Sequence, residues 1–363
     1  MLASFLKKYD KNLLVIIVIL TIWGFINFYS ISTPLFSKNL TEQYKYLFLF
    51  LLKNVILAIF GFIMFSSISW KTLKRISLPL FIIFFLFMLL AFLPGLRPTG
   101  QTTARWLDLK IFSFQPTEFL KFTMLLWLAF FLPRLHKEFK LPYERSIVLI
   151  LILGTVSVFI YLQPTFSNLA IIWASIGAGY LSLKPKAKEL LPFVVLIIIF
   201  VIISSAYGYR VQRVVDFLYG NGEGKTSYQK TQSRLAIGSG GIMGRGIGNS
   251  KIKFIGLPLI NSDSVFSVVA EETGFVGSAT LIGIFIFLIL TVIKNALVTA
   301  NSEKKFFVYG VATWISVQAF IHIASNMGII PTTGVPLPFF SHGFSSQLAL
   351  MCALGVINNL ANS

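Results

Sequence analysis

Long apolar runs recur along the whole chain, and they constrain its fold more than any other feature of the sequence. Several of these runs reach about 20 residues, the length that a helix needs to cross the hydrocarbon core of a bilayer. Apolar residues make up 56% of the 363 residues and charged residues only 12%, whereas a soluble domain carries about 25% charged residues. The sequence therefore predicts an all-α polytopic membrane protein, in which residues 1–363 form a single integral membrane domain.

We expect ten membrane-spanning helices, which use almost the whole chain. Their expected bounds are Asn12–Ser32, Tyr46–Ser67, Leu78–Leu93, Glu118–Leu132, Ile147–Leu162, Phe166–Leu183, Leu190–Tyr207, Ser264–Ile293, Lys305–Met327 and Ser346–Leu360. The first run follows three lysines, as the apolar core of a signal peptide would. It is too long for such a core and lacks a small-residue cleavage site, so we expect it to be retained. The single cysteine, Cys352, has no partner for an intramolecular disulfide.

Basic residues are distributed unevenly between the loops, and this predicts the orientation of the chain. With a cytoplasmic N-terminus, the inner segments carry 16 basic residues and the short outer loops carry five. The inner ones are Lys7, Lys8, Lys11, Lys71, Lys74, Arg75, Arg134, Lys137, Lys140, Arg145, Lys184, Lys186, Lys188, Lys294, Lys304 and Lys305; the outer ones are Lys38, Lys45, Arg97, Arg105 and Lys110. Because basic residues collect in cytoplasmic loops, both termini are expected to be cytoplasmic. The same bias explains the net charge of +18 without nucleic acid as a partner.

Two outer segments are longer than a turn, and they cover residues 94–117 and 208–262. The second is strongly basic: it holds Arg210, Arg213, Lys225, Lys230, Arg234, Arg245, Lys251 and Lys253 against Asp216 and Glu223. Such a surface would attract an anionic partner, for instance a pyrophosphate or an anionic headgroup. A loop that is charged only for solubility explains the pattern equally well. The stretch NGEGKTSYQK, at 221–230, is expected to be a solvated tip.

Charged side chains within the expected spans include Lys53, Glu118, Lys121, Glu271 and Glu272. A charge at the centre of a membrane helix costs about 2.5–3.5 kcal/mol on insertion scales, so these positions are candidates for function. Glu118 and Lys121 are three residues apart and share a helix face. We expect them to pair and to line an internal polar cavity. The alternative is an ion pair that only fixes helix packing.

Asp263 stands at the outer end of an expected span, next to the basic segment. The position is typical of a helix N-cap, and a cap is one interpretation of this carboxylate. A functional carboxylate is the other. The helix after it has a polar or small face at Ser264, Ser267, Glu271, Gly274 and Ser278, which indicates close packing against another helix.

The glycine-rich run AIGSGGIMGRGIGNS, at 236–250, contains neither of the glycine motifs that bind nucleotides. It is interpreted either as a flexible turn or as a set of backbone N–H groups that approach a phosphate. The three histidines, His136, His322 and His342, have no spacing that suggests zinc. Nucleotide, haem and zinc are therefore not expected as cofactors.

Four stretches together resemble the SEDS family (shape, elongation, division and sporulation), which includes FtsW, RodA and SpoVE. They are RWLDLKIFSFQPTEFLK at 105–121, QSRLAIGSGGIMGRGIGNSKIK at 232–253, LPLINSDSVFSVVAEETGFVG at 257–277 and PTTGVPLPFFSHGFSS at 331–346. With the ten expected spans, the resemblance covers nearly the whole chain. The patterns G-N-S-x-x-K at 248–253 and P-T-T-G at 331–334 are closer to the FtsW branch than to RodA.

The resemblance implies a peptidoglycan glycosyltransferase that polymerises lipid II on the outer face of the bacterial cytoplasmic membrane, for cell division or elongation. It implies a class B penicillin-binding protein as a transpeptidase partner, alongside other division or elongation membrane proteins. Two alternatives from other classes fit the same polar residues. One is a lipid II flippase without chemistry, and the other is a scaffold that only recruits the transpeptidase.

The resemblance also implies roles for individual residues. Asp263 matches the family's essential aspartate and is expected to act as the catalytic base or its close electrostatic partner, with a divalent cation (Mg²⁺ or Mn²⁺) as an optional helper whose ligands are unknown. Expected substrate contacts are Lys53, Arg105, Glu118, Lys121, Arg210, Arg213, Gln232, Ser233, Lys253, Ser341, Ser345 and Ser346. Glu271 and Glu272 are expected to brace the helix that presents Asp263.

The chain departs from the family pattern at several positions inside the same stretches. The family's aspartate in Q-P-D is Thr165, and the glutamate, histidine and threonine before the essential aspartate are Leu259, Asn261 and Ser262. The tyrosine and the second glycine of S-Y-G-G-S-S are His342 and Phe344. Roles that depend on the missing groups are therefore not carried over.

Overall fold

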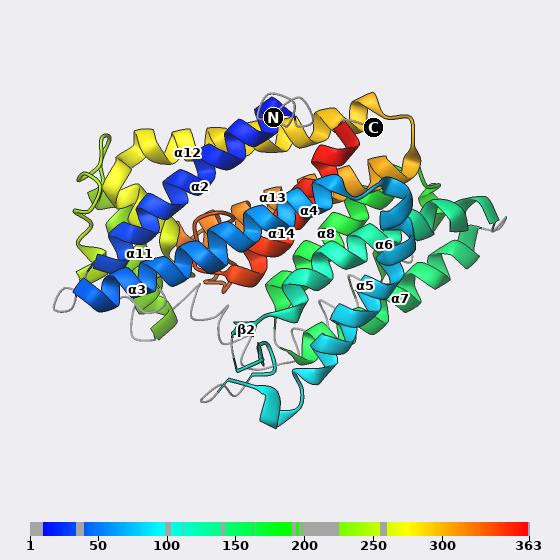
Figure 1. Cartoon of the computed structure of the whole chain (residues 1–363), viewed down its shortest axis with the longest axis horizontal. Helices are drawn as coiled ribbons and strands as arrows, with labels where there is room; N and C mark the ends of the chain where they lie inside the picture. Colours follow the sequence, from blue (N-terminus) through cyan, green and yellow to red (C-terminus); the bar gives the residue numbers. More distant parts are fainter. Residues whose placement is uncertain are drawn as a thin grey trace.

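Helices make up most of the computed structural model shown in Figure 1, which describes residues 10–33, 40–98, 103–110, 112–138, 142–163, 165–190, 194–195, 198, 225–254 and 260–361. The helices are α2 (Lys11–Ser32), α3 (Leu40–Phe50), α4 (Leu57–Ser67), α5 (Trp70–Leu90), α6 (Pro116–Glu138), α7 (Pro142–Leu162), α8 (Phe166–Leu181), α11 (Lys225–Ser239), α12 (Val265–Val298), α13 (Ser302–Asn326) and α14 (Phe344–Ala361). A π-helical segment, η2 (Leu51–Ile56), joins α3 to α4. Two short 3₁₀ helices, η3 (Pro94–Leu96) and η4 (Ile252–Phe254), and one small antiparallel pair, β1 (Leu107–Asp108) with β2 (Ser113–Phe114), complete the described elements.

The predicted all-α membrane class is confirmed. Among the described residues, six helical segments are long and apolar enough to cross a membrane, and two shorter apolar helices join them. Every predicted span except Leu190–Tyr207 coincides with helical structure, and that span lies largely outside the described residues. The third span was predicted to start at Leu78, whereas the helix α5 starts at Trp70. The hydroxyl of Ser69 caps α5 by accepting from the backbone N–H of Thr72, so this helix includes the basic turn before Leu78.

The segment 208–262 was expected to be one long loop, and the described part of it corrects this expectation. Residues 225–239 form α11, which packs against α12 and α13. The last residues of the expected solvated tip therefore belong to a helix. The Lys230 side chain extends from α11 toward the end of α13, with its Cε 3.2 Å from the position that a Cβ on Gly328 would occupy. Segment 94–117 likewise contains η3 and the β1–β2 pair.

Helix α14 lies in the middle of the bundle, against α4 and α6 (Figure 1). Almost every residue from Ser345 to Asn358 is buried. Two glycines allow the close contact with α4. A Cβ on Gly355 would collide with the backbone carbonyl of Phe62, and a Cβ on Gly61 would lie 2.9 Å from the Cys352 sulfur. Small residues at such positions let membrane helices approach closely and gain packing energy.

The two described ends of the chain meet, because the backbone N–H of Asp10 donates to the side-chain oxygen of Asn358 at 2.9 Å. We call this side of the bundle the Asp10 end. Helices α12 and α14 start, and α13 finishes, on the opposite side, which we call the Asp263 end. Basic residues at the Asp10 end include Lys71, Lys74, Arg75, Arg134, Arg145, Lys184, Lys186, Lys188, Lys304 and Lys305, whereas those of α11 and the glycine-rich segment lie beside the first half of α12.

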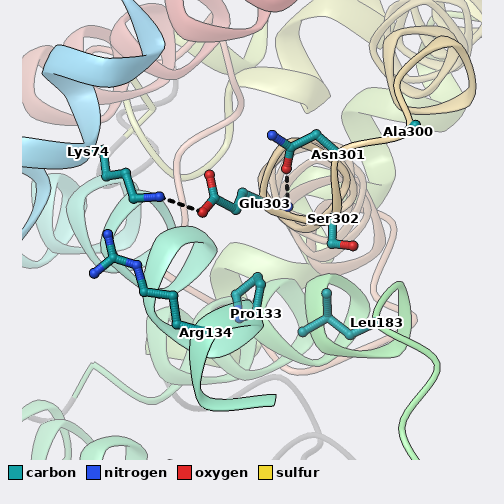
Figure 2. Close-up of a pocket in the computed structure, with 8 residues that line it drawn as sticks. All are labelled: Lys74, Pro133, Arg134, Leu183, Ala300, Asn301, Ser302 and Glu303. Carbon is teal, nitrogen blue, oxygen red and sulfur yellow. Dashed lines mark hydrogen bonds and ion pairs between the residues drawn. The ribbon is translucent and has the colours of Figure 1, made fainter. Parts of the chain in front are cut away.

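A cavity of about 720 Å³ opens at the Asp10 end (Figure 2). It is lined by Lys74 from α5, Pro133 and Arg134 from α6, Leu183 after α8, and Ala300–Glu303 at the start of α13. These elements present their other ends to the Asp263 side. The cavity and Asp263 are therefore on opposite sides of the bundle.

Helix α12 is interrupted at Gly274, whose φ of 66° and ψ of −162° are not helical. The glycine-rich segment 240–246 supplies partners for the backbone groups that the break releases. Arg245 and Gly246 donate their N–H groups to the carbonyls of Glu271 and Glu272, both at 3.0 Å. The N–H groups of Phe275 and Val276 donate to the carbonyls of Gly241 and Ile242, at 2.9 and 3.1 Å. Irregular backbone in a membrane helix is tolerated where protein satisfies it in this way.

Candidate functional site

The turn before α12 holds Asp263, which the sequence offered either as a helix cap or as a functional carboxylate. The N-cap position of α12 is Ser264, and no side chain caps that end. The Asp263 carbonyl accepts a hydrogen bond from the Asn326 side chain of α13 at 2.9 Å. On the other side of the turn, the hydroxyl of Ser341 donates to the carbonyl of Ser262 at 2.7 Å. The half-buried aspartate is thus presented by a turn that is fixed from two directions.

The Asp263 carboxylate faces the segment 331–338. Its Oδ2 lies 3.8 Å from the position that a Cβ on Gly334 would occupy. Any larger residue at 334 would therefore stand against the carboxylate. Glycine lets the backbone of the segment pass close to the carboxylate.

Helix α13 carries a polar stripe of Gln318, His322 and Asn326, which we call the α13 stripe. The four-residue spacing places the three side chains on one face, and all three are buried. Gln318 Nε2 donates to the Pro336 carbonyl at 2.9 Å, and His322 Nδ1 lies 2.8 Å from the Val335 carbonyl. Since Asn326 holds the Asp263 turn, the α13 stripe fixes both the carboxylate and the segment that it faces.

The predicted pairing of Glu118 with Lys121 is present in the structure. Lys121 Nζ lies 2.7 Å from Glu118 Oε2, and both side chains are almost completely buried. The same ammonium group donates to Gln318 Oε1 at 3.2 Å, and Trp314 Nε1 donates to that oxygen at 2.6 Å. The pair therefore connects through Gln318 to the segment beside Asp263.

The polar region around this pair contains buried groups that lack hydrogen-bond partners. Within the described part of the chain, Glu118 Oε1 and His322 Nε2 are both buried without one. Buried polar atoms are nearly always hydrogen-bonded in native proteins, so these atoms mark a place where a further polar species fits. This supports the expectation that the pair lines a polar cavity, which stays a prediction.

Two positions where the chain departs from the family pattern, Asn261 and His342, contact each other beside Asp263. The backbone N–H of His342 donates to the Asn261 carbonyl at 2.8 Å. The imidazole packs near Phe28 and Phe50, with ring centroids 5.4 and 5.7 Å away, although part of the side chain stays exposed. Desolvation against these rings, and then the positive charge of Lys53, lower the pKa of His342. Lys53 lies in η2, and its effect on His342 indicates that it is on the same side of the bundle as the Asp263 turn.

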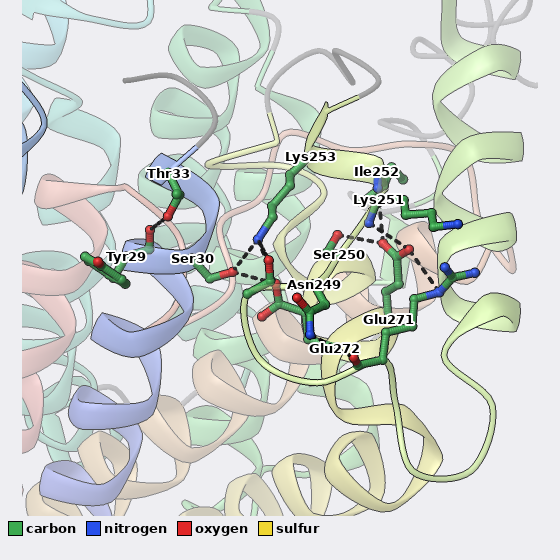
Figure 3. Close-up of polar contacts among 12 residues, drawn as sticks. Tyr29, Ser30, Thr33, Asn249, Ser250, Lys251, Ile252, Lys253, Glu271 and Glu272 are labelled. Carbon is green, nitrogen blue, oxygen red and sulfur yellow. Dashed lines mark hydrogen bonds and ion pairs between the residues drawn. The ribbon is translucent and has the colours of Figure 1, made fainter. Parts of the chain in front are cut away.

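Glu271 and Glu272 anchor the glycine-rich segment to α12 (Figure 3). Glu271 accepts from the Ser250 hydroxyl at 2.6 Å and from the backbone N–H groups of Lys251 and Ile252 at 3.0 and 3.2 Å. Glu272 accepts from the Ser30 hydroxyl of α2 at 2.5 Å. These contacts favour the bracing role that was expected of the two glutamates.

Lys253 was expected to contact substrate phosphate, but in the structure its ammonium group has its partners inside the protein. Its ammonium group lies 3.3 Å from Glu272 Oε1, donates to Ser30 Oγ at 3.0 Å and also contacts the Gly248 carbonyl. Only 1% of the side chain is exposed. An ammonium group has three donors, and here all three are already used inside the protein.

The remaining expected substrate contacts fall into three groups. Ser345 and Ser346 are buried, and their hydroxyls accept from the Gln115 backbone N–H and the Gln318 side chain. Arg105 is half-buried and donates to the Gln163 carbonyl at 3.1 Å, and Gln232 and Ser233 lie on α11. Arg210 and Arg213 lie outside the described residues, as does Leu259.

Sequence reasoning missed the α13 stripe. Its signal was visible as three polar side chains at four-residue spacing in an otherwise apolar span. The notable feature of these residues is their partners, which are backbone carbonyls of the segment 335–336 and of Asp263. Such partners follow from tertiary structure, and no spacing in the sequence indicates them.

The donor set around Asp263 does not form a divalent cation site of its own. Mg²⁺ is usually bound by one or two carboxylates together with substrate phosphates. Asp263 is a single carboxylate, and the described residues contain no group of three or more His, Cys, Asp or Glu side chains that could hold a metal. We therefore derive no step through a cation.

Comparisons with known proteins agree with one another. The family model described as a cell cycle protein, which groups FtsW, RodA and SpoVE, matches residues 10–363. A probable peptidoglycan glycosyltransferase FtsW from Coxiella burnetii is 34% identical over 301 residues, covering 79% of this chain and 79% of that protein. A protein of the same name from Geobacter sp. is 29% identical over 362 residues, covering 98% and 97%.

Two solved structures share the fold. One is a chain of a peptidoglycan synthase complex, from a study of the structural coordination of polymerization and crosslinking. It has a TM-score of 0.75 at 22% identity, and the match covers 97% of each chain. The rod shape determining protein RodA of Thermus thermophilus has a TM-score of 0.65 at 23% identity, covering 97% of this chain and 96% of that one. The arrangement of helices described above is therefore shared over nearly the full length.

Proposed function

Because the chain belongs to the FtsW, RodA and SpoVE family of cell cycle proteins, we propose that it is a peptidoglycan glycosyltransferase that polymerises lipid II into β-1,4 glycan. The relatives that carry the name FtsW favour the FtsW-like branch. The observation that carries the proposal is the placement of Asp263. A half-buried carboxylate on a turn that is fixed from two directions, beside the glycine at 334, is suited to accept a proton from a bound hydroxyl.

The reaction inverts the configuration at the sugar carbon that reacts. Lipid II holds this carbon in an α linkage to pyrophosphate, and the product linkage is β. In a single displacement, the acceptor 4-hydroxyl oxygen forms the new bond to this carbon while the bond to the pyrophosphate oxygen breaks. Asp263 takes the hydroxyl proton, and the bond electrons leave with the pyrophosphate.

The departing pyrophosphate needs positive charge, which lowers the energy of the transition state. Lys53 is a suitable cation, since its charge acts on His342, which contacts Asn261 just before the Asp263 turn. We assign the first phosphate contact to Lys53. Lys121 is already paired with Glu118 and held by Gln318, so its role is to position the polar wall beside the site. Arg210 and Arg213 stay proposed as further phosphate contacts.

The chain is a membrane protein, and we propose that it lies in the bacterial cytoplasmic membrane with its Asp263 end facing outward. The collection of basic residues at the opposite end supports this orientation. A class B penicillin-binding protein is the proposed partner. The support is the shared fold with a chain from a peptidoglycan synthase complex.

The proposal is tested with the purified protein and lipid II in detergent, with glycan length read on a gel. Wild type should form polymer without any other glycosyltransferase. Asp263→Asn should reduce the rate by about 10²-fold or more, because asparagine cannot take the proton. The turn should survive the change, since Asn326 holds the Asp263 main-chain carbonyl rather than the carboxylate.

Asp108→Asn is the matched control. It makes the same chemical change in the β1–β2 pair, where Asp108 is also half-buried, and it should leave the rate unchanged. Polymer yield near wild type from Asp263→Asn would overturn the catalytic assignment. Translocation of the lipid II headgroup by wild type without any polymer would overturn the glycosyltransferase itself.

A further inference from the structure

The cavity at the Asp10 end is built from four helix ends (Figure 2). It lies on the side of the bundle away from Asp263. Its volume of about 720 Å³ is in the range of small-molecule sites. Pro133, Leu183 and Ala300 give it apolar walls, and Asn301 and Ser302 add neutral polar groups. The glycosyltransferase chemistry proposed above makes no use of it.

The charges in the cavity do not balance. Lys74 Nζ lies 2.8 Å from Glu303 Oε1, and the second carboxylate oxygen accepts from Trp70 Nε1 at 3.2 Å. Glu303 is therefore fully engaged by these two groups. Arg134 also lines the cavity, and it is exposed; no carboxylate among the described residues pairs with it. The lining keeps one positive charge to offer to an anion.

An apolar track leads away from the cavity along α5. Starting from Lys74, the residues Leu78, Ile82 and Leu86 follow at four-residue steps, and their side chains are 43%, 45% and 51% exposed. This spacing places them along one side of the helix. A ligand with an anionic head and an apolar tail could place its head at Arg134 and its tail on this track.

We propose that the cavity binds the phosphate-bearing headgroup of an anionic phospholipid. Arg134 contacts the phosphate, because a guanidinium group forms paired hydrogen bonds with phosphate oxygens. Asn301 and Ser302 contact the hydroxyl groups of a glycerol headgroup, and the acyl chains lie on the exposed face of α5. Basic pockets between helix ends are typical of such sites, and further basic residues, among them Lys71 and Arg75, lie at the same end.

The site can be tested by native mass spectrometry of the full-length protein in a neutral detergent. Phosphatidylglycerol and phosphatidylcholine are supplied at equal concentration, and the lipid retained by the protein is counted. Wild type should retain phosphatidylglycerol in preference. Arg134→Gln should lower that preference about fivefold, since one basic residue near an anionic headgroup contributes a factor of this size.

Lys186→Gln is the matched control. It removes the same charge at the same end of the bundle from an exposed residue that does not line the cavity, so it should retain the lipid as wild type does. Ser302→Trp fills the cavity without changing its charge and should also lower retention. Melting temperatures in detergent verify that each variant is folded.

Three outcomes would overturn the proposal. The first is equal retention by wild type and Arg134→Gln, and the second is an equal loss with Lys186→Gln, which would show a diffuse charge effect. The third is displacement of the lipid by glycerol phosphate at the same concentration. That result would assign the cavity to a soluble phosphate compound. None of these readouts depends on polymerase activity, so the lipid site and the proposed function stand or fail separately.

Discussion

Lys121 and Lys253 are both buried lysines paired with a glutamate, but their further contacts assign them to different tasks. Lys121 reaches Gln318, which holds the segment beside the Asp263 carboxylate. Lys253 reaches Ser30 on α2 and the Gly248 carbonyl, which are parts of the framework. Residue type and depth are the same in the two pairs. The neighbours of the ammonium group decide whether a substitution affects the site or the stability of the fold.

Lys253→Met is expected to lower stability. Removing one member of a buried ion pair leaves an uncompensated charge and costs about 3–5 kcal/mol. Thermal unfolding in detergent measures the loss. The double variant Lys253→Met with Glu272→Gln should recover part of it, because the stranded carboxylate is then neutral. An unfolding midpoint for the single variant equal to that of wild type would show that the pair contributes nothing.

At the scale of elements, the glycine-rich segment and the break in α12 form one unit. Sequence reasoning left two interpretations of the segment, a flexible turn or a phosphate cradle. In the structure, the N–H groups of Gly244, Arg245 and Gly246 donate to protein carbonyls. These groups are not available to a phosphate. The glycines are needed because the backbone of the segment lies directly against the backbone of α12.

Gly244→Ala and Gly248→Ala test this explanation as a matched pair. Both glycines have a left-handed φ, 81° and 89°, so alanine costs roughly 1–2 kcal/mol in conformation at either position. A Cβ on Gly248 meets nothing within 4 Å, whereas one on Gly244 collides with the Glu272 carbonyl. Overpacking adds about 1–3 kcal/mol, so Gly244→Ala should unfold at a clearly lower temperature. Equal midpoints for the two variants would contradict the close contact.

The helices were the part of the structure that the sequence could predict. A segment that crosses a bilayer must be apolar and must satisfy its own backbone hydrogen bonds, and a long helix does both. The Glu118–Lys121 pair was predictable for a similar reason, since three-residue spacing on a helix fixes their distance. The break at Gly274 and the partners of the α13 stripe were not predictable. Both depend on contacts with segments far away in the chain, such as Gly241 with Phe275 and His322 with Val335. Helix α11 was missed because its polar composition resembles that of a loop.

At the scale of the whole molecule, the bundle has two chemically distinct ends. The cavity, with Lys74 and Arg134 in its lining, lies at the Asp10 end, and the residues assigned to the proposed reaction lie at the Asp263 end. A cavity at one end and the proposed catalytic carboxylate at the other suit a protein whose proposed reaction takes place at one face of the membrane. The orientation is therefore open to a direct test.

Single cysteines report that orientation, because the native Cys352 is buried and should not react. Leu109→Cys lies on an exposed position near the Asp263 end, and Lys186→Cys lies on an exposed position at the Asp10 end. In intact spheroplasts, a membrane-impermeant maleimide should label the first variant and spare the second. After the cells are broken, both should react. The reverse pattern would place Asp263 in the cytoplasm and exclude synthesis on the outer face.

The burial of α14 has a consequence for how the protein is made. This helix leaves the ribosome after every other described helix, yet it packs against α4 and α6, which enter the membrane much earlier. Until α14 arrives, the face of α4 around Gly61 and its counterpart on α6 must be covered by lipid or by the insertion machinery. Final assembly is then a post-insertion docking step, in which a late segment displaces its temporary neighbours. A nascent chain that stalls before α14 would present an unfilled slot, which membrane proteases could recognise as a sign of incomplete synthesis.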